Sequence, residues 1–84
     1  MKEKAVALKY DSKVASAPLV TAKGEGKTAS SIIKIAKEHD IPIKKDEDLV
    51  ELLSKVKIDK EIPQEMYKAV AEVFSFIYKM TRKN

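Results

Sequence analysis

The sequence has no cysteine and a single histidine, His39. Without cysteine, neither disulfide bonds nor thiolate metal sites can stabilise the chain. A metal site would have to rely almost entirely on carboxylates, and no second histidine is present to complete a catalytic group. We therefore expect no metal, no cofactor and no catalytic residue, and we interpret His39 as a residue that caps the end of a helix or packs against it.

Long hydrophobic runs are also missing, since no apolar run approaches the roughly 18 residues that a membrane span requires. The first residues, Met1–Lys4, do not resemble a signal peptide. We expect no direct membrane insertion and a cytoplasmic location, with docking at a membrane complex left open. A length of 84 residues indicates one domain covering residues 1–84, with one modest core.

Arginine is nearly absent, because 16 lysines and one arginine face 13 acidic residues, for a net charge of +4. The lysines are scattered along the chain, and the aromatic residues lie mainly near its end. A nucleic-acid-binding protein usually combines a basic patch with arginines and stacking aromatics. We expect no nucleic-acid partner, but a small basic nucleic-acid-binding protein remains the alternative function, and the salt dependence of DNA binding would distinguish it.

The centre of the chain, Leu19–Lys44, has the pattern of strand, loop, helix and strand. Such a unit joins two parallel strands by a right-handed crossover. We therefore predict parallel pairing between Leu19–Lys23 and Ile41–Lys44, connected by a helix over residues 28–39.

The flanking segments add to this unit. Ala5–Tyr10 is predicted as a strand of the same sheet, with its direction left open. Asp46 or Asp48 can cap a short helix, and Ile62-Pro63 begins a last helix that runs to about Thr81. The predicted fold class is α/β, a small mixed sheet of about three strands with three helices in the order β-β-α-β-α-α.

Two apolar stripes run along the last helix. The first consists of Met66, Val70, Val73, Ile77 and Met80, and the second of Tyr67, Ala71, Phe74 and Tyr78. Together they are wider than the apolar face of an ordinary surface helix. The sheet can cover one stripe, so the second either packs inside the domain or stays partly open as a docking patch.

The loop Gly24–Thr28 resembles the end of a phosphate-binding loop. A complete motif needs another glycine five residues before Gly26, where this sequence has Thr21. We expect no nucleotide binding, and we expect Thr28 to cap the following helix.

Several blocks of the sequence resemble the C-terminal cytoplasmic domain of the flagellar export switch protein, the FlhB family, and its type III secretion relatives. These blocks are Ala5–Asp11, Ala17–Gly24, Glu38-His39 with Ile41-Pro42, and Ile62–Val73. Members of that family cut themselves within an Asn-Pro-Thr-His motif just before the first of these blocks. Here Met1-Lys2-Glu3 occupies that place, so the resemblance implies a free-standing paralogue that lacks the membrane domain and cannot cleave itself.

The resemblance implies a non-enzymatic binding module that acts like the cleaved fragment of the family, in substrate recognition or specificity switching. The implied partners are rod- and hook-type export substrates, the hook-length ruler protein and the membrane subunits of the export gate. The implied contact is an apolar pocket formed by Ala17, Pro18, Ala71 and Phe74. Whether the module replaces, assists or competes with the family fragment stays open.

Overall fold

The computed structural model describes residues 3–11, 13 and 16–81, with the backbone alone for residues 80 and 81. Two strands, β1 (Lys4–Lys9) and β2 (Leu19–Glu25), form an antiparallel sheet. Three helices follow, namely α1 (Lys27–Glu38), α2 (Glu47–Leu53) and α3 (Tyr67–Thr81), the last preceded by the 3₁₀ turn η1 (Gln64–Met66). The mixed α/β class is therefore confirmed, with two strands in the described residues.

The predicted strand Ile41–Lys44 is not a strand, and its parallel pairing with Leu19–Lys23 is wrong. In its place, the segment between α2 and η1, residues 54–63 and called the connector below, lies along the outer edge of β2. The N–H of Val20 donates to the carbonyl of Lys60 at 3.1 Å, and the N–H of Asp59 donates to the carbonyl of Val20 at 2.7 Å. These bonds, with the bridge between Leu19 and Glu61, occupy the outer edge of β2 at its beginning, so a parallel strand cannot pair there.

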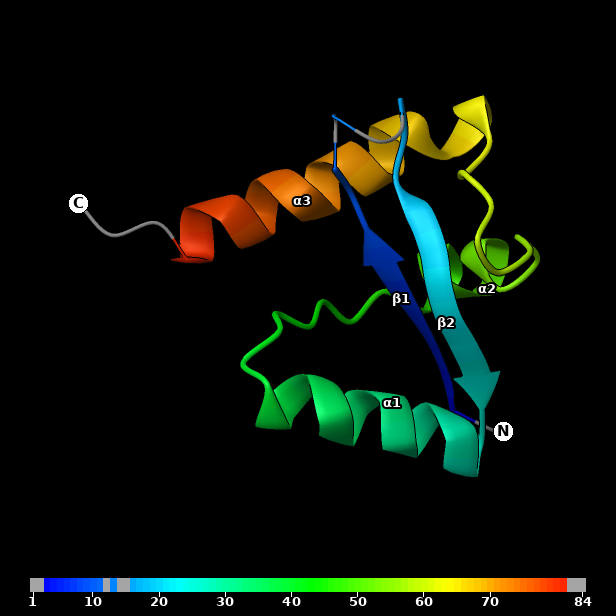
Figure 1. The fold of residues 1–84 in the computed structure, drawn as a ribbon, viewed down its shortest axis with the longest axis vertical. Helices are drawn as coiled ribbons and strands as arrows, with labels where there is room; N and C mark the ends of the chain where they lie inside the picture. Colours follow the sequence, from blue (N-terminus) through cyan, green and yellow to red (C-terminus); the bar gives the residue numbers. More distant parts are fainter. Residues whose placement is uncertain (1–2, 12, 14–15, 82–84) are drawn as a thin grey trace.

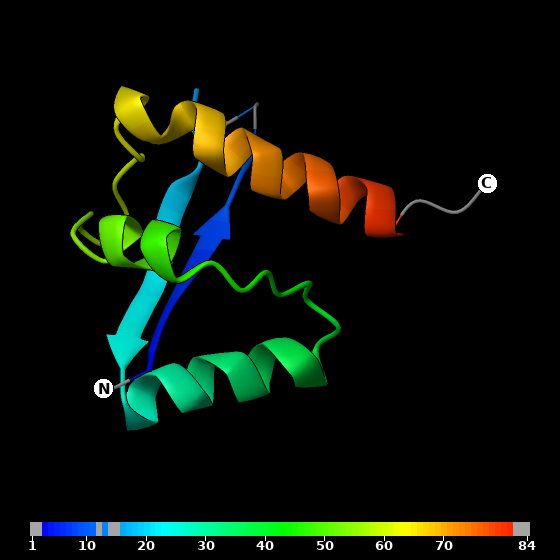
Figure 2. The ribbon, with the colours of Figure 1, turned by 180° about the vertical axis from the view of Figure 1, so that it is seen from behind.

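The three helices surround the hairpin on different sides (Figure 1). The helix α1 crosses the end where β1 begins and β2 ends, and α3 crosses the opposite end. The helix α2 lies behind the sheet in Figure 1 and in front of it in Figure 2, so it covers one face. The segment that joins α1 to α2 runs on the β1 side of the hairpin in both views.

The local signals at the helix ends are partly as predicted. Asp46 caps α2, since its side chain accepts a hydrogen bond from the N–H of Leu49 at 3.0 Å. His39 follows the last residue of α1, and its N–H bonds to the carbonyl of Ile35. Thr28, in contrast, lies inside α1 and does not cap it, because Gly26 is the capping residue with φ 62°.

One hydrophobic core joins the hairpin to α2, α3 and the connector. Its buried members are Ala17, Val20, Leu49, Leu53, Ile62 and Val70. Val20 and Val70 are the largest side chains in full burial, at 0% and 1% exposure. Val20 belongs to β2, and Val70 belongs to the first apolar stripe of α3. The core therefore fixes α3 against the sheet.

Candidate functional site

An open pocket of about 330 Å³ lies between the start of α3 and the segment that leads into β2. All four residues that the sequence predicted for a binding site line it, namely Ala17, Pro18, Ala71 and Phe74. Tyr10, Ser16, Ile62, Tyr67 and Val70 complete the lining. The structure therefore brings together, at one pocket, two pairs of residues that are more than 50 positions apart in the sequence.

The floor of the pocket is part of the core. Ala17, Ile62 and Val70 are almost fully buried, at 2%, 2% and 1% exposure. Pro18 is half-buried beside them. Because the floor residues pack into the core, the base of the pocket is a fixed apolar surface that does not depend on loop closure.

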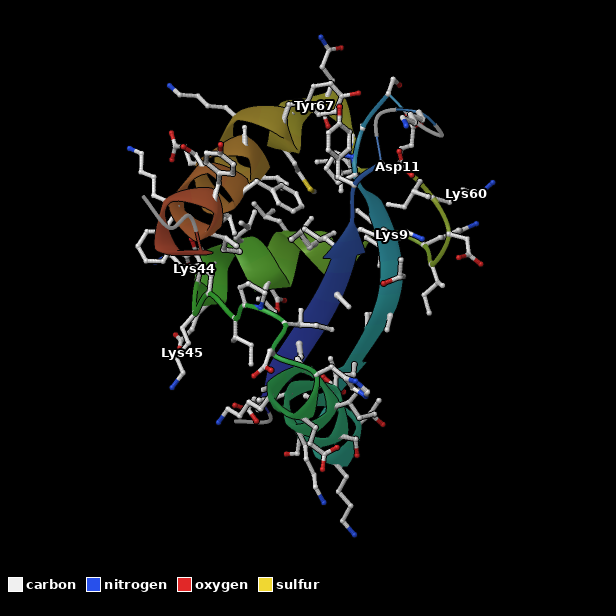
Figure 3. The ribbon with its side chains drawn as sticks, turned by 60° about the vertical axis from the view of Figure 1, so that its left-hand side comes forward. Lys9, Asp11, Lys44, Lys45, Lys60 and Tyr67 are labelled. Atoms are coloured by element: carbon white, nitrogen blue, oxygen red, sulfur yellow. The ribbon has the colours of Figure 1, made fainter. Side chains whose placement is uncertain are left out.

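The walls of the pocket are aromatic and more exposed. The ring of Tyr10 lies 6.4 Å from the ring of Phe74, tilted by 45°. Tyr10 and Tyr67 are 50% and 40% exposed, and Figure 3 shows Tyr67 at the start of α3, close to the end of β1. Each tyrosine in these walls combines an apolar ring with a polar phenolic hydroxyl.

The second stripe of α3 explains why the pocket is open. Its member Ala71 is exposed, Phe74 is half-buried, and Tyr78 is 61% exposed. The first stripe is covered by the core, with Val70 buried and Val73 half-buried; the side chain of Met80, the last residue of that stripe, lies outside the described part. The alternative that the second stripe packs wholly inside the domain is therefore wrong for Ala71.

The site predicted from the sequence did not include five of the lining residues, among them Tyr10 and Ile62. Tyr10 follows directly after β1, and its ring reaches the pocket because the antiparallel hairpin places the end of β1 next to the start of β2. Ile62 is placed by a hydrogen bond from its N–H to the carbonyl of Pro18 at 3.0 Å. Local periodicity predicts neither placement. The one available signal is the apolar Ile62 directly before Pro63, since an apolar residue just before a helix often packs against the helix.

The glycine loop has a structural role in the described residues. Gly24 lies within β2, and the N–H of Gly26 donates to the carbonyl of Glu3 at 2.7 Å. A phosphate-binding loop presents free N–H groups to its ligand, and here the N–H of Gly26 is already bonded. Within the described residues, there is also no group of three or more histidine or acidic residues that could hold a metal ion.

No helix among the described residues is long and apolar enough to cross a bilayer. The charged groups form one ion pair in this part of the chain, between Lys4 of β1 and Glu51 of α2. The hydrogen bond from Lys4 holds the pKa of the Glu51 carboxyl below its ordinary value, and the same bond raises the pKa of Lys4. This pair lies outside the pocket lining, so the pocket itself is an uncharged apolar site.

Comparison with known proteins places the chain among export proteins. Residues 2–77 match the model of the FlhB HrpN YscU SpaS family. The chain is 51% identical over 77 residues to the uncharacterized protein YlqH of Bacillus subtilis, covering 92% of this chain and 83% of that protein. It is 41% identical over 80 residues to the flagellar biosynthetic protein FlhB of the same organism, covering 94% of this chain and 22% of that protein.

Solved structures show the same fold. The cytoplasmic domain of FlhB from Shewanella putrefaciens matches with a TM-score of 0.85 and 37% identity, covering 89% of this chain and 59% of that one. The PscU C-terminal domain matches with a TM-score of 0.83 and 29% identity, covering 88% and 95%. The chain thus spans about a fifth of the length of the FlhB protein of Bacillus subtilis.

Proposed function

Because the chain belongs to the FlhB, HrpN, YscU and SpaS family, we propose that it is a non-enzymatic protein-binding module of a flagellar or type III export apparatus. Its site is the pocket between α3 and the segment before β2. The observation that carries the proposal is the convergence of Ala17, Pro18, Ala71 and Phe74 on one open apolar pocket. The module acts at the cytoplasmic side of the export gate, in substrate recognition or in the change of substrate class.

The ligand of the pocket is a short apolar segment of an export substrate of the rod or hook type. The pocket lies open to solvent and has aromatic walls, and its lining lacks charged residues. Such a site favours one bulky apolar side chain that packs against the buried floor on one side and against the rings of Tyr10 and Phe74 on the other. The hook-length ruler protein and the membrane subunits of the gate are further partners in this proposal.

The affinity should be low. Burial of a phenylalanine-sized side chain contributes roughly 1.5–3 kcal/mol, and ordering of the peptide subtracts from that gain. A short segment should therefore bind near a Kd of about 1 mM, which corresponds to about −4 kcal/mol. Weak binding suits a gate that has to release each substrate before the next one enters.

NMR titration with N-terminal peptides of rod and hook substrates tests this proposal. The expected result is a set of saturable shifts at Ala17, Ala71 and Phe74. Ala71→Asp should abolish the shifts, because a carboxylate placed in an apolar pocket loses hydration without a partner. The thermal midpoint should change little, because Ala71 is exposed.

Ala69→Asp is the matched control, because Ala69 is an exposed alanine of the same helix that does not line the pocket. It should bind the peptides as the natural chain does. Equal loss of binding in both variants, or shifts confined to residues away from the pocket, would show that the pocket is not the substrate site.

A further inference from the structure

A tight turn in the connector lies beside the outer edge of β2. The N–H of Lys60 donates to the carbonyl of Lys57 at 3.2 Å, which closes a β-turn over residues 57–60. Asp59 is the third residue of this turn and has φ 68°, as in a type II turn. Ile58 is the second residue and is 47% exposed. The turn therefore presents an exposed isoleucine between two lysines.

Hydrogen bonds to β2 hold the turn in place. The N–H of Asp59 donates to the carbonyl of Val20 at 2.7 Å, and the N–H of Val20 donates to the carbonyl of Lys60 at 3.1 Å. The ammonium group of Lys23, also in β2, donates to the carbonyl of Val56 at 2.8 Å, directly before the turn. Because these bonds fix the turn before any partner arrives, a partner that binds it loses little free energy to ordering.

Positive charge exceeds negative charge at this turn. Lys57 and Lys60 are exposed, and their Cα atoms lie within about 7 Å of each other because they open and close the turn. Neither lysine forms an ion pair in the described part of the chain. The ammonium of Lys23 bonds there to two backbone carbonyls and to no carboxylate. Asp59 is the one acid inside the turn, and the next acid, Glu61, accepts a hydrogen bond from a serine hydroxyl at 3.3 Å.

We propose that the turn 57–60 binds an acidic segment of another protein, one that carries an apolar residue between its carboxylates. The two lysines attract carboxylates on either side of Ile58. Ile58 in turn supplies an apolar contact for the residue between those carboxylates.

Other kinds of partner fit the turn less well. A nucleic-acid site usually contains arginines and stacking aromatics, and the connector, residues 54–63, contains neither. A membrane surface binds through a broad apolar face, whereas this turn offers a single exposed isoleucine. An acidic protein segment is therefore the partner that matches both the charge and the apolar contact.

The turn is separate from the pocket of the proposed function. None of Lys57, Ile58 and Lys60 lines that pocket. Figure 3 shows Lys60 pointing away from the domain, on the side opposite Lys44 and Lys45. An acidic partner can therefore bind the turn while a substrate segment occupies the pocket, and the two proposals stand or fail independently.

NMR titration of the chain with a short acidic peptide tests the proposal. The probe is Glu-Glu-Leu-Glu-Glu with both ends blocked, and the readout is the amide shifts of Ile58, Asp59 and Lys60. Exposed ion pairs with one apolar contact support weak binding, with a Kd of about 1 mM. The neutral peptide Gln-Gln-Leu-Gln-Gln should bind at least about tenfold more weakly. Added salt should weaken binding of the acidic peptide at least about threefold, because it screens exposed charges.

Charge reversal in the protein locates the site. Lys57→Glu with Lys60→Glu should weaken binding of the acidic peptide at least about tenfold. The fold should be kept, because the bonds that hold the turn at these positions are made by backbone groups. Lys44→Glu with Lys45→Glu is the matched control, since it changes the net charge equally on the other side of the domain, and it should weaken binding less than about threefold.

Two further variants test the apolar contact and the independence from the pocket. Ile58→Ala should weaken binding about threefold, and Ile41→Ala, at an isoleucine that is 54% exposed after α1, should not. Ala71→Asp should leave binding at the turn unchanged, so a failed pocket would not be mistaken for a failed turn.

The outcomes that would overturn the proposal are distinct. Equal loss of binding in the two charge-reversal pairs would show that the peptide responds to net charge alone. Absence of shifts at residues 57–60 with the peptide well above about 1 mM would show that the turn binds no acidic segment. Tighter binding of an oligothymidylate or of a phosphatidylglycerol vesicle at this turn would assign it to nucleic acid or membrane. Sedimentation of the chain alone should show a monomer, and a dimer that Lys57→Glu with Lys60→Glu dissociates would make a second copy the partner, contrary to the proposal.

Discussion

The N–H of Ile62 donates a hydrogen bond to the carbonyl of Pro18 at 3.0 Å, and both residues line the same pocket. The bond ties the start of the last helical segment to the start of β2. Ile62 is 2% exposed and belongs to the core. The pocket is therefore built where a core contact and a backbone bond coincide, which gives it a fixed shape before any ligand arrives.

Ile62→Ala should lower the free energy of unfolding by about 3 kcal/mol, because it removes buried methyl and methylene groups and leaves a cavity under the pocket. Ile58→Ala is the control within the same connector, since Ile58 is 47% exposed, and it should cost about 0.5 kcal/mol or less. Urea unfolding measures both. Equal losses in the two variants would contradict the role given to Ile62 as a core anchor.

Gly24→Ala should destabilise the fold by about 1–3 kcal/mol. A Cβ atom at this position would lie 2.2 Å from Cγ2 and 2.7 Å from Cβ of Thr28. Thr28→Gly removes both atoms and should restore part of the loss in the double variant, although glycine in a helix costs about 1 kcal/mol. Thermal unfolding of the two single variants and the double variant gives the coupling, and strictly additive effects would show that the close approach to Thr28 is not the cause.

The pair of Lys4 and Glu51 predicts a small dependence of stability on pH. The pKa of Glu51 is held below its ordinary value of 4.5 by the hydrogen bond from Lys4, so its contribution is present above pH 4.5 and is lost as the pH falls through the folded-state pKa. The pKa of Lys4 is raised above 10.5 by the same bond, so its contribution is present below pH 10.5 and is lost as the pH rises through the folded-state pKa.

Glu51→Gln should therefore lower the Tm slightly at pH 7 and hardly at all in strong acid, since the natural carboxylate is then protonated as well. The effect is small because the two side chains are 33% and 54% exposed. Glu72→Gln, on the exposed surface of α3, is the control variant, and it should leave the Tm at pH 7 nearly unchanged. A Tm difference for Glu51→Gln that stays constant into acid would mean that the ion pair is not its source.

The loop Gly24–Thr28 should bind no nucleotide, because Thr21 stands where a phosphate-binding loop has glycine and the Gly26 N–H is already bonded to Glu3. Calorimetry with ATP and magnesium should give no heat of binding. A micromolar Kd that disappears in Lys27→Ala would contradict this reading of the loop.

The chain should not cleave itself between an asparagine and a proline, since residues 1–84 contain no Asn-Pro pair. Intact-mass spectrometry after long incubation at neutral pH should show one species, apart from removal of Met1. Two stable internal fragments would show that another residue performs cleavage.

The sequence by itself determined the elements whose signals are local. The β-rich runs around Val6 and Val20, the cap at Asp46 and the two stripes of α3 are read from propensity and spacing, because these depend on residues within one or two turns of each other. The residues of the pocket were predicted from a resemblance, and the width of the apolar face on α3 agreed with it. Their placement around one pocket then followed from the structure.

Only the tertiary structure decided which edges of the sheet are occupied. Ile41–Lys44 has the composition of a strand, yet the edge of β2 that it was expected to share is bonded to Asp59 and Lys60, nearly 40 residues from Val20. Backbone hydrogen bonds are the same for every residue type except proline, so the sequence carries no label for the partner that a strand edge will take.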